Sequence, residues 1–249
     1  MSRQDGIIYV KQQGAMRTGT NLVKFALEEN FTNVRVLVNI GRWKHAGAET
    51  PFNWHGLDWE GEGRSVEVFS RISRDELSAA RAAVEAGAVR FAISVRGVYS
   101  WLVSYLRFTR ENNNEPVVPL ADLPGDRIVA ALAEWNALYR SYLPHVADEP
   151  RARVFRLEDL LNHFSATLDS VRHLWGLQPR HRRYVKPARY LRAGIDGQSR
   201  AELLHPSRQF DRRRYAPGAH LTQFDDPLLA LVRQSVDKEV VSAYGYDLL

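Results

Sequence analysis

The fold is decided by residues 6–21, which read GIIYVKQQGAMRTGTN. The apolar run from Gly6 to Lys11 predicts a buried strand. A glycine-containing turn follows, and the residues from Leu22 to Glu29 then predict a helix. A strand, a glycine-rich turn and a helix together favour phosphate binding, because the turn lets backbone N–H groups point inward and the helix N-terminus carries partial positive charge.

Strands and helices alternate along the rest of the chain. Further strands are predicted by β-branched, apolar runs at Val34 to Ile40, Val89 to Val95 and Arg153 to Leu157. Further helices are predicted at Ser73 to Gly87, Tyr99 to Arg110, Asp126 to Tyr142, Glu158 to Trp175 and Pro227 to Tyr244. The alternation predicts a three-layer α/β fold, in which a mostly parallel sheet carries helices on both faces. We expect one domain over residues 1–249, because neither a linker nor an internal repeat interrupts the pattern.

Composition excludes several classes of site. The 249 residues are 45% hydrophobic and include no cysteine, which excludes disulfide scaffolds, cysteine-ligated zinc and iron–sulfur clusters.

No apolar run reaches the roughly 18 residues of a membrane span, and the first residues do not have the pattern of a signal peptide. A cytoplasmic protein is therefore expected. His163 and His173 lack the H-E-x-x-H spacing, so no metal site is predicted.

Positive charge is concentrated in one segment. The whole chain has a net charge of +5, and residues 180–214 alone hold eleven Lys or Arg against three acids. Such a segment favours an anionic partner. It has no nucleic-acid-binding motif and is interrupted by Pro187 and Pro206, so nucleic acid is not the expected partner.

The turn from Gln13 to Asn21 has part of a phosphate-loop pattern. Gly14 and Gly19 have the spacing of G-x-x-x-x-G-K-[ST], but Thr20 and Asn21 replace its Lys and its Mg²⁺-binding hydroxyl. Without those two groups the turn is poorly equipped for β- and γ-phosphates with Mg²⁺. It suits a single 5′-phosphate, with Arg17 as the cation at the bridging oxygen. The alternative is an ordinary turn between a strand and a helix.

A second polar pair follows the third predicted strand. Arg96 comes directly after Val95, at the carboxyl end where open α/β sheets bind ligands. Ser104 lies eight residues further on, about two turns along the next helix. A helix leaning over the sheet edge would bring both side chains to one phosphate.

These two regions resemble the PAPS-dependent sulfotransferase superfamily. Its 5′-phosphosulfate loop, [KR]-S-G-T-[TN], is similar to R-T-G-T-N at 17–21, and its 3′-phosphate motif, R-[ND]-P-x-x-x-x-x-S-x-[YW], is similar to R-G-V-Y-S-W-L-V-S at 96–104. The stretches R-L-E-D-L-L at 156–161 and L-W-G-L at 174–177 resemble the family's Y-E-D-L and F-L-G-L, so the resemblance spans residues 7–177. The chain departs from the family at Gly97 and Val98, which replace Asn or Asp and Pro. It also departs at Leu157, which replaces a Tyr near the adenine.

The resemblance implies a P-loop-like sulfotransferase fold and metal-independent transfer of a sulfuryl group from PAPS to a hydroxyl group, with PAP as the product. The acceptor would be a carbohydrate or another small molecule. Arg96 and Ser104 would hold the 3′-phosphate, and the late basic residues Arg208 and Arg212 to Arg214 lie in the part of the chain that closes over it. The 5′-phosphosulfate would be held by Arg17, Thr18, Gly19, Thr20 and Asn21.

The resemblance also implies a histidine base beside a lysine. Lys44 and His45 follow the second predicted strand, at the sheet edge that carries the phosphate loop. His45 would take the acceptor proton, Lys44 would bind the sulfuryl oxygens, and Arg17 would stabilise charge on the leaving phosphate oxygen. The alternative for His45 is a surface histidine. The same loop offers other candidate bases, His55, Asp58 and Glu60, and an aromatic acceptor surface made of Trp43, Phe52, Trp54 and Trp59.

Two other functions stay open at this point. A P-loop small-molecule kinase would bind ATP with Mg²⁺, which Thr20 and Asn21 disfavour. A non-catalytic nucleotide- or polyanion-binding protein would keep the loop without a working base. A comparison of PAP with ADP and Mg·ATP distinguishes the kinase from the other two functions. Tight PAP binding with no transfer to any acceptor would favour the non-catalytic protein.

Overall fold

The computed structural model describes residues 6–37, 45, 74–148, 151–186, 189–191, 204–209 and 218–248. Its centre is a four-stranded sheet in the order β2-β1-β3-β4, with every neighbouring pair parallel. The strands are β1 (Ile8–Gly14), β2 (Val34–Leu37), β3 (Arg90–Val95) and β4 (Ala152–Arg156). This confirms the predicted parallel sheet. The carboxyl ends of the strands meet at one edge, where Gly14 is paired with Ser94 and Val95 with Arg156.

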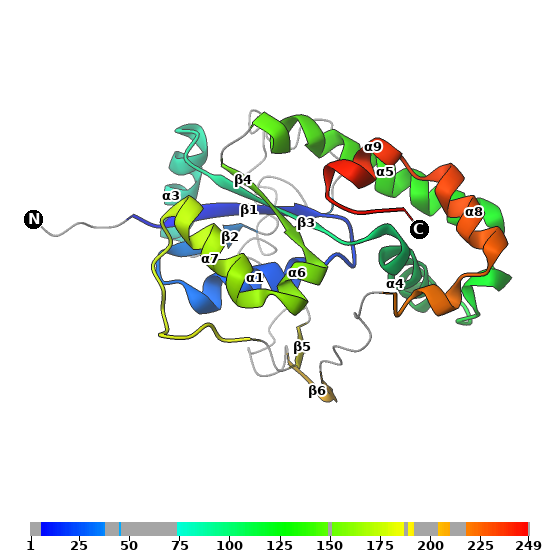
Figure 1. The fold of residues 1–249 in the computed structure, drawn as a ribbon. Coiled ribbons are helices and arrows are strands. Elements are labelled where there is room, and N and C mark those ends of the chain that lie inside the picture. The colour runs from blue at the N-terminus through cyan, green and yellow to red at the C-terminus, as the bar shows by residue number, and fades with distance from the viewer. Residues whose placement is uncertain are drawn as a thin grey trace, which may run out of the picture.

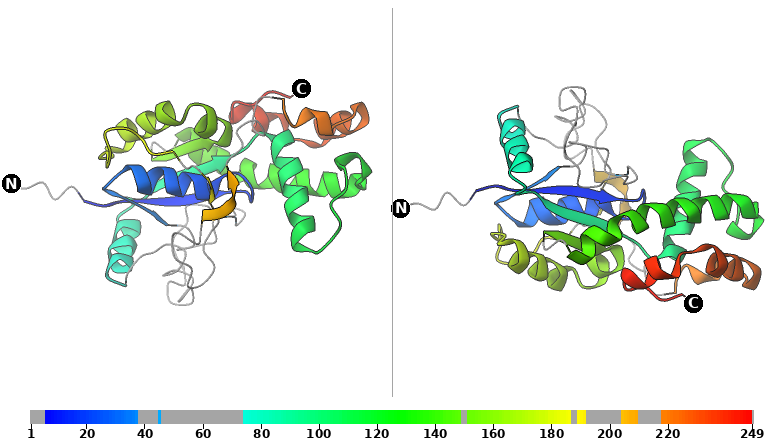
Figure 2. Two further views of the ribbon diagram at one scale, coloured as in Figure 1. Left: turned by 90° about the horizontal axis from the view of Figure 1, so that it is seen from below. Right: turned by 90° about the horizontal axis from the view of Figure 1, so that it is seen from above.

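Helices cover both faces of the sheet, as Figures 1 and 2 show. One face packs against α1 (Thr20–Asn30), α6 (Leu157–Asn162) and α7 (Phe164–Trp175). Val10, Phe155 and Leu27 are fully buried in this layer. The opposite face carries α3 (Arg74–Glu85), whose Val84 packs in one cluster with Phe91. The three-layer α/β architecture is therefore as predicted.

A group of helices lies beyond the carboxyl edge of the sheet. It consists of α4 (Val98–Asn112), α5 (Gly125–Asp148), α8 (Asp226–Ser235) and α9 (Lys238–Ala243). Its core contains Trp101, Trp135 and Tyr139, each at most 1% exposed, and joins the sheet through Ile93 and Val95. In Figure 2 the group lies at the end of the strands away from the N-terminus. It therefore borders the edge where a parallel sheet binds its ligands.

Helix α5 is longer than the sequence predicts, because it continues through Pro144. A proline inside a helix removes one backbone hydrogen bond and clashes with the preceding turn. Tyr142 is fully buried before the proline, and Leu143 and Val146 pack against the same core, so burial on both sides offsets that loss. Among the described helices, none is long and apolar enough to cross a membrane.

Two predicted helices are each divided in the structure. The stretch 158–175 is broken at His163, whose backbone angles are φ −124° and ψ 36°, into α6 and α7. The break lets Leu161 and Phe164 both pack into the layer against the sheet. The stretch 227–244 is broken at Asp237, whose carboxylate accepts the N–H groups of Glu239 and Val240 and so caps a new helix.

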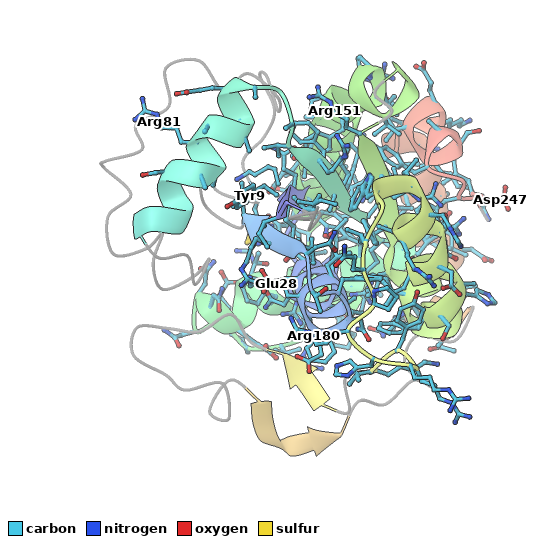
Figure 3. All side chains as sticks on the ribbon, turned by 90° about the vertical axis from the view of Figure 1, so that its left-hand side faces the viewer. Tyr9, Glu28, Arg81, Arg151, Arg180 and Asp247 are labelled. Atoms are coloured by element: carbon cyan, nitrogen blue, oxygen red, sulfur yellow. The ribbon has the colours of Figure 1, made fainter. Side chains whose placement is uncertain are left out.

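The basic segment begins by packing against α1. Arg180 donates hydrogen bonds to the backbone oxygens of Glu28 and Phe31, both at 3.3 Å (Figure 3). Further along, β5 (Arg189–Leu191) and β6 (Leu204–Gln209) form an antiparallel pair that the sequence does not predict. These strands read RYL and LHPSRQ and have no apolar alternation, which is the signal that sequence patterns provide for strands.

Candidate functional site

The loop from Ala15 to Gly19 joins β1 to α1 at the carboxyl edge of the sheet. Its shape requires glycine at both ends. Gly14 has φ +148°, and a Cβ there would lie 2.4 Å from the backbone oxygen of Ser94. Gly19 has φ +85°, and a Cβ there would lie 2.7 Å from Cδ1 of Leu157. The two glycines that the sequence pattern singled out therefore allow the strand and the helix to pass close to their neighbours.

Side chains from other elements hold the loop in place. The Tyr139 hydroxyl of α5 donates to the Ser94 oxygen at 2.8 Å and accepts the Ala15 N–H at 3.3 Å. Burial raises the pKa of Tyr139 well above its ordinary value, so the hydroxyl keeps its proton. The indole N–H of Trp101 in α4 donates to the Met16 oxygen at 2.8 Å. Protein groups alone thus hold the backbone of the loop at Ala15 and Met16.

The threonines of the loop face inward. Thr18 is 1% exposed, and its hydroxyl donates to the Ala15 oxygen at 2.7 Å. Thr20 is 5% exposed. These residues would therefore meet a ligand through backbone N–H groups rather than through hydroxyls. Helix α1 has no side-chain cap and no acidic residue in its first turn, so its N-terminus keeps its partial positive charge.

Arg17, Arg96 and Ser104 come together at this loop. The exposed Arg17 donates from Nε to Oγ of Ser104 at 3.3 Å, and its guanidinium lies 5.0 Å from the centre of the Phe108 ring. Arg96 is 4% exposed and donates from Nη1 to the backbone oxygen of Arg17 at 3.3 Å. It also donates from Nε to Oγ of Ser100 at 2.8 Å. Arg17 is therefore the exposed cation of the loop. The buried Arg96 holds the loop backbone through its hydrogen bond to the Arg17 oxygen.

Glu158 is a site residue that the sequence pattern marks only as part of a motif and as the start of a predicted helix. Its Oε1 accepts the Gly97 N–H at 3.0 Å and the Ser100 hydroxyl at 3.4 Å, and its Oε2 accepts the Tyr246 hydroxyl at 2.7 Å. It thereby fixes the turn between β3 and α4 that presents Arg96. Its position two residues after the end of β4, at the same sheet edge, is the sequence signal that could have identified it.

His220 is a second residue that sequence reasoning missed. It precedes the short helix η3 (Leu221–Gln223) and is partly buried. Burial and then the positive charge of Arg96 lower the pKa of His220 to about 4, while Glu158 acts in the opposite direction. His220 is therefore neutral at pH 7 and lies in the electrostatic environment of Arg96. No motif or periodicity at positions 218–224 marks it.

The depressed pKa of His220 predicts a loss of stability in mild acid. In the unfolded chain His220 gains a proton near its ordinary pKa of 6.5, whereas in the folded chain it does so only near 4. Between these values the unfolded state binds more protons, so stability falls as the pH decreases. We expect the melting temperature to fall less between pH 7 and pH 4.5 in His220→Gln than in the wild-type protein. The exposed His181→Gln is the control, and an equal fall in all three proteins would contradict the assignment.

His45 lies beside the end of β1. Its Nδ1 is 2.7 Å from the backbone oxygen of Gly14. Because a carbonyl oxygen only accepts hydrogen bonds, Nδ1 carries the proton, and the lone pair of the neutral ring is on Nε2. Among the residues with described positions, no group of three His, Asp or Glu side chains could hold a metal ion. Other predicted site residues lie outside the described residues, namely Lys44, Trp43, Phe52, Trp54, His55, Asp58, Trp59, Glu60 and Arg212 to Arg214, and Arg208 is described only in its backbone.

No protein-family model matches the chain, and no curated protein matches it in sequence. Among solved structures, the chain is similar to mouse sulfotransferase SULT7A1 complexed with PAP, with 10% identity, a TM-score of 0.42, and coverage of 97% of this chain and 79% of that one. It is also similar to the sulfotransferase domain of the Synechococcus PCC 7002 olefin synthase, with 15% identity, a TM-score of 0.40, and coverage of 98% and 96%. Both matched proteins are sulfotransferases, the family that the sequence motifs resemble.

Proposed function

We propose that the protein is a PAPS-dependent sulfotransferase that acts on a hydroxyl group of a carbohydrate or another small molecule without a metal ion. One observation carries the proposal. Arg17 is hydrogen-bonded to both Arg96 and Ser104, which the motifs assign with it to one cofactor, although Arg17 is 79 residues from Arg96 and 87 from Ser104. An ordinary turn between a strand and a helix would not require this convergence.

The residues present fit a bisphosphorylated cofactor. Arg17 offers an exposed guanidinium, which matches the oxygens of a phosphate group. The uncapped N-terminus of α1 offers the backbone N–H groups of Thr20 and Asn21 to the 5′-phosphosulfate, and the loop adds those of Thr18 and Gly19. Ser104 and the positive charge of Arg96 serve the 3′-phosphate. The first turn of α1 has no acidic residue, so no carboxylate there repels the phosphates of the cofactor.

The proposed chemistry combines the positions of Arg17 and His45 with the roles that the family resemblance implies. When bound, PAPS supplies a sulfuryl group whose S–O bond to the 5′-phosphate breaks as the acceptor oxygen forms a new one. Arg17 stabilises the negative charge that develops on the 5′-phosphate side. His45 takes the acceptor proton on Nε2 while its Nδ1–H is held by the Gly14 oxygen at 2.7 Å. Lys44, the adjacent residue, is assigned to the sulfuryl oxygens.

Ligand stabilisation tests the proposal against its rivals. A ligand at a hundredfold excess over its Kd adds about 2.7 kcal/mol to the free energy of unfolding. We expect PAP to raise the melting temperature more than ADP or Mg·ATP does. A larger shift with Mg·ATP would favour a small-molecule kinase. A shift with PAP but no transfer to any acceptor hydroxyl would favour a non-catalytic binding protein.

The role of His45 can be separated from cofactor binding. His45→Ala is expected to lower turnover by about 10²-fold, because general-base catalysis contributes at least that much. The shift in melting temperature with PAP should be unchanged, since His45 is not assigned to PAP. The control is His173→Ala on the exposed surface of α7. Turnover close to wild type in His45→Ala would remove His45 from the mechanism.

A further inference from the structure

We propose that a cavity between α4 and α5 is a second binding site, specific for a small organic carboxylate. The cavity has a volume of about 240 Å³ and is lined by Tyr105, Leu106, Arg110, Leu123, Ala131 and Glu134, among others. This is smaller than the sites of drug-sized ligands, which start at about 300 Å³. It therefore fits a ligand the size of one substituted ring or a short branched acid.

The buried arginine in the wall of this cavity is the main evidence. Arg110 is only 9% exposed, and within the described structure its Nε and Nη1 have no hydrogen-bond partner. The nearest carboxylate, that of Glu115, lies 3.8 Å from Nε. Glu115 is instead bound to Arg127, at 2.6 and 3.3 Å. A buried guanidinium with two nitrogens that make no hydrogen bond is costly, so a ligand anion that completes its bonding would stabilise the site.

The other polar groups of the cavity favour a monoanion. A guanidinium binds a planar carboxylate through two parallel hydrogen bonds. Glu115 and Glu134 also line this space, and the Arg127 guanidinium that lines it is already paired with Glu115, so a dianion such as phosphate is less favoured than a monoanion. Glu134 accepts the Tyr105 hydroxyl at 2.6 Å, and burial raises the pKa of Tyr105 so that this hydroxyl stays protonated. The aliphatic lining residues favour an apolar body on the ligand.

The cavity is separate from the phosphate loop but connected to it. The Tyr105 ring, which lines the cavity, stacks on Trp101 with a centroid distance of 4.6 Å and an angle of 14° between the rings. Trp101 holds the Met16 oxygen of the loop. The site does not depend on the proposed sulfotransferase activity, because none of its lining residues is assigned to PAP, to the acceptor or to the transfer step.

Benzoate and benzylammonium are matched probes that differ in charge. We expect benzoate to bind the wild-type protein saturably in isothermal titration calorimetry, and benzylammonium not to bind. Arg110→Met should weaken benzoate binding at least tenfold, because it removes the guanidinium and keeps a long apolar side chain. Arg107→Met is the control, since Arg107 is an exposed residue of the same helix that pairs with Glu111.

A second variant changes the cavity without changing Arg110, so that the test does not depend on the folding of Arg110→Met. Ala131→Leu narrows the cavity and leaves Arg110 in place, and it should also weaken benzoate binding. PAP binding should be unchanged in both cavity variants. If PAP binds none of the proteins but benzoate binds as expected, the proposed function fails and the carboxylate site stands. The carboxylate site is overturned by equal benzoate affinity in Arg110→Met and wild type, by equal binding of benzylammonium, by displacement of benzoate by PAP, or by no saturable benzoate binding to the wild type.

Discussion

Arg17→Ala is expected to lower kcat/KM for the proposed sulfuryl transfer by at least about 10³-fold. Arg17 is the exposed cation of the loop, and removal of one group that stabilises charge in a transition state costs about 10²- to 10³-fold in kcat. The loss of a charge-assisted hydrogen bond to phosphate adds about 1.5–3 kcal/mol in binding. Steady-state kinetics with PAPS and calorimetric titration with PAP measure the two contributions separately.

Two further variants test whether the loss of activity is specific to the Arg17 guanidinium. Arg17→Lys keeps the positive charge but loses the guanidinium and its Nε–H bond to Ser104, so its activity should lie between those of Arg17→Ala and wild type. Arg107→Ala, which removes an exposed cation from α4, should have wild-type kinetics. If Arg17→Ala and Arg107→Ala behave alike, the loop does not bind the cofactor in the way proposed.

Gly14→Ala is expected to destabilise the protein by about 3–5 kcal/mol, because two unfavourable effects add. The residue would have φ +148°, a conformation that costs about 1–3 kcal/mol for a side chain other than glycine. Its Cβ would lie 2.4 Å from the Ser94 oxygen, which belongs to the backbone of the adjacent strand, and overpacking of this kind costs about 1–3 kcal/mol. Thermal unfolding should show a decrease in melting temperature on the order of 10 °C.

Two other glycines provide matched comparisons. A Cβ at Gly6 would meet nothing within 4 Å, so Gly6→Ala should leave the melting temperature within about 2 °C of wild type. The melting temperature of Gly19→Ala should lie between those of Gly14→Ala and Gly6→Ala. The Cβ at position 19 would meet the tip of the Leu157 side chain, which can move, although φ +85° remains unfavourable. A Gly14→Ala protein as stable as Gly6→Ala would mean that β1 and β3 do not approach as closely as described.

The sequence predicts the structure best where a feature depends on a single helix or strand. The strands around Val10 and Ile93 are predictable because both are largely apolar runs, and the structure buries these two residues completely. The helix that carries Ser104 after Arg96 is predictable from its apolar face. The break at His163 and the continuation through Pro144 are not predictable, because both depend on packing against elements distant in sequence. Glu158 and His220 were missed for the same reason, since their surroundings form only when β3, β4 and the C-terminal residues meet.

The bonds that Tyr139 and Trp101 make to the loop have a consequence for kinetics. Because these two side chains fix the backbone at Ala15 and Met16, the loss of conformational entropy there occurs when the chain folds and not when an anion arrives. For the phosphate binding proposed above, association would then be governed by diffusion and long-range attraction rather than by a slow rearrangement of the loop.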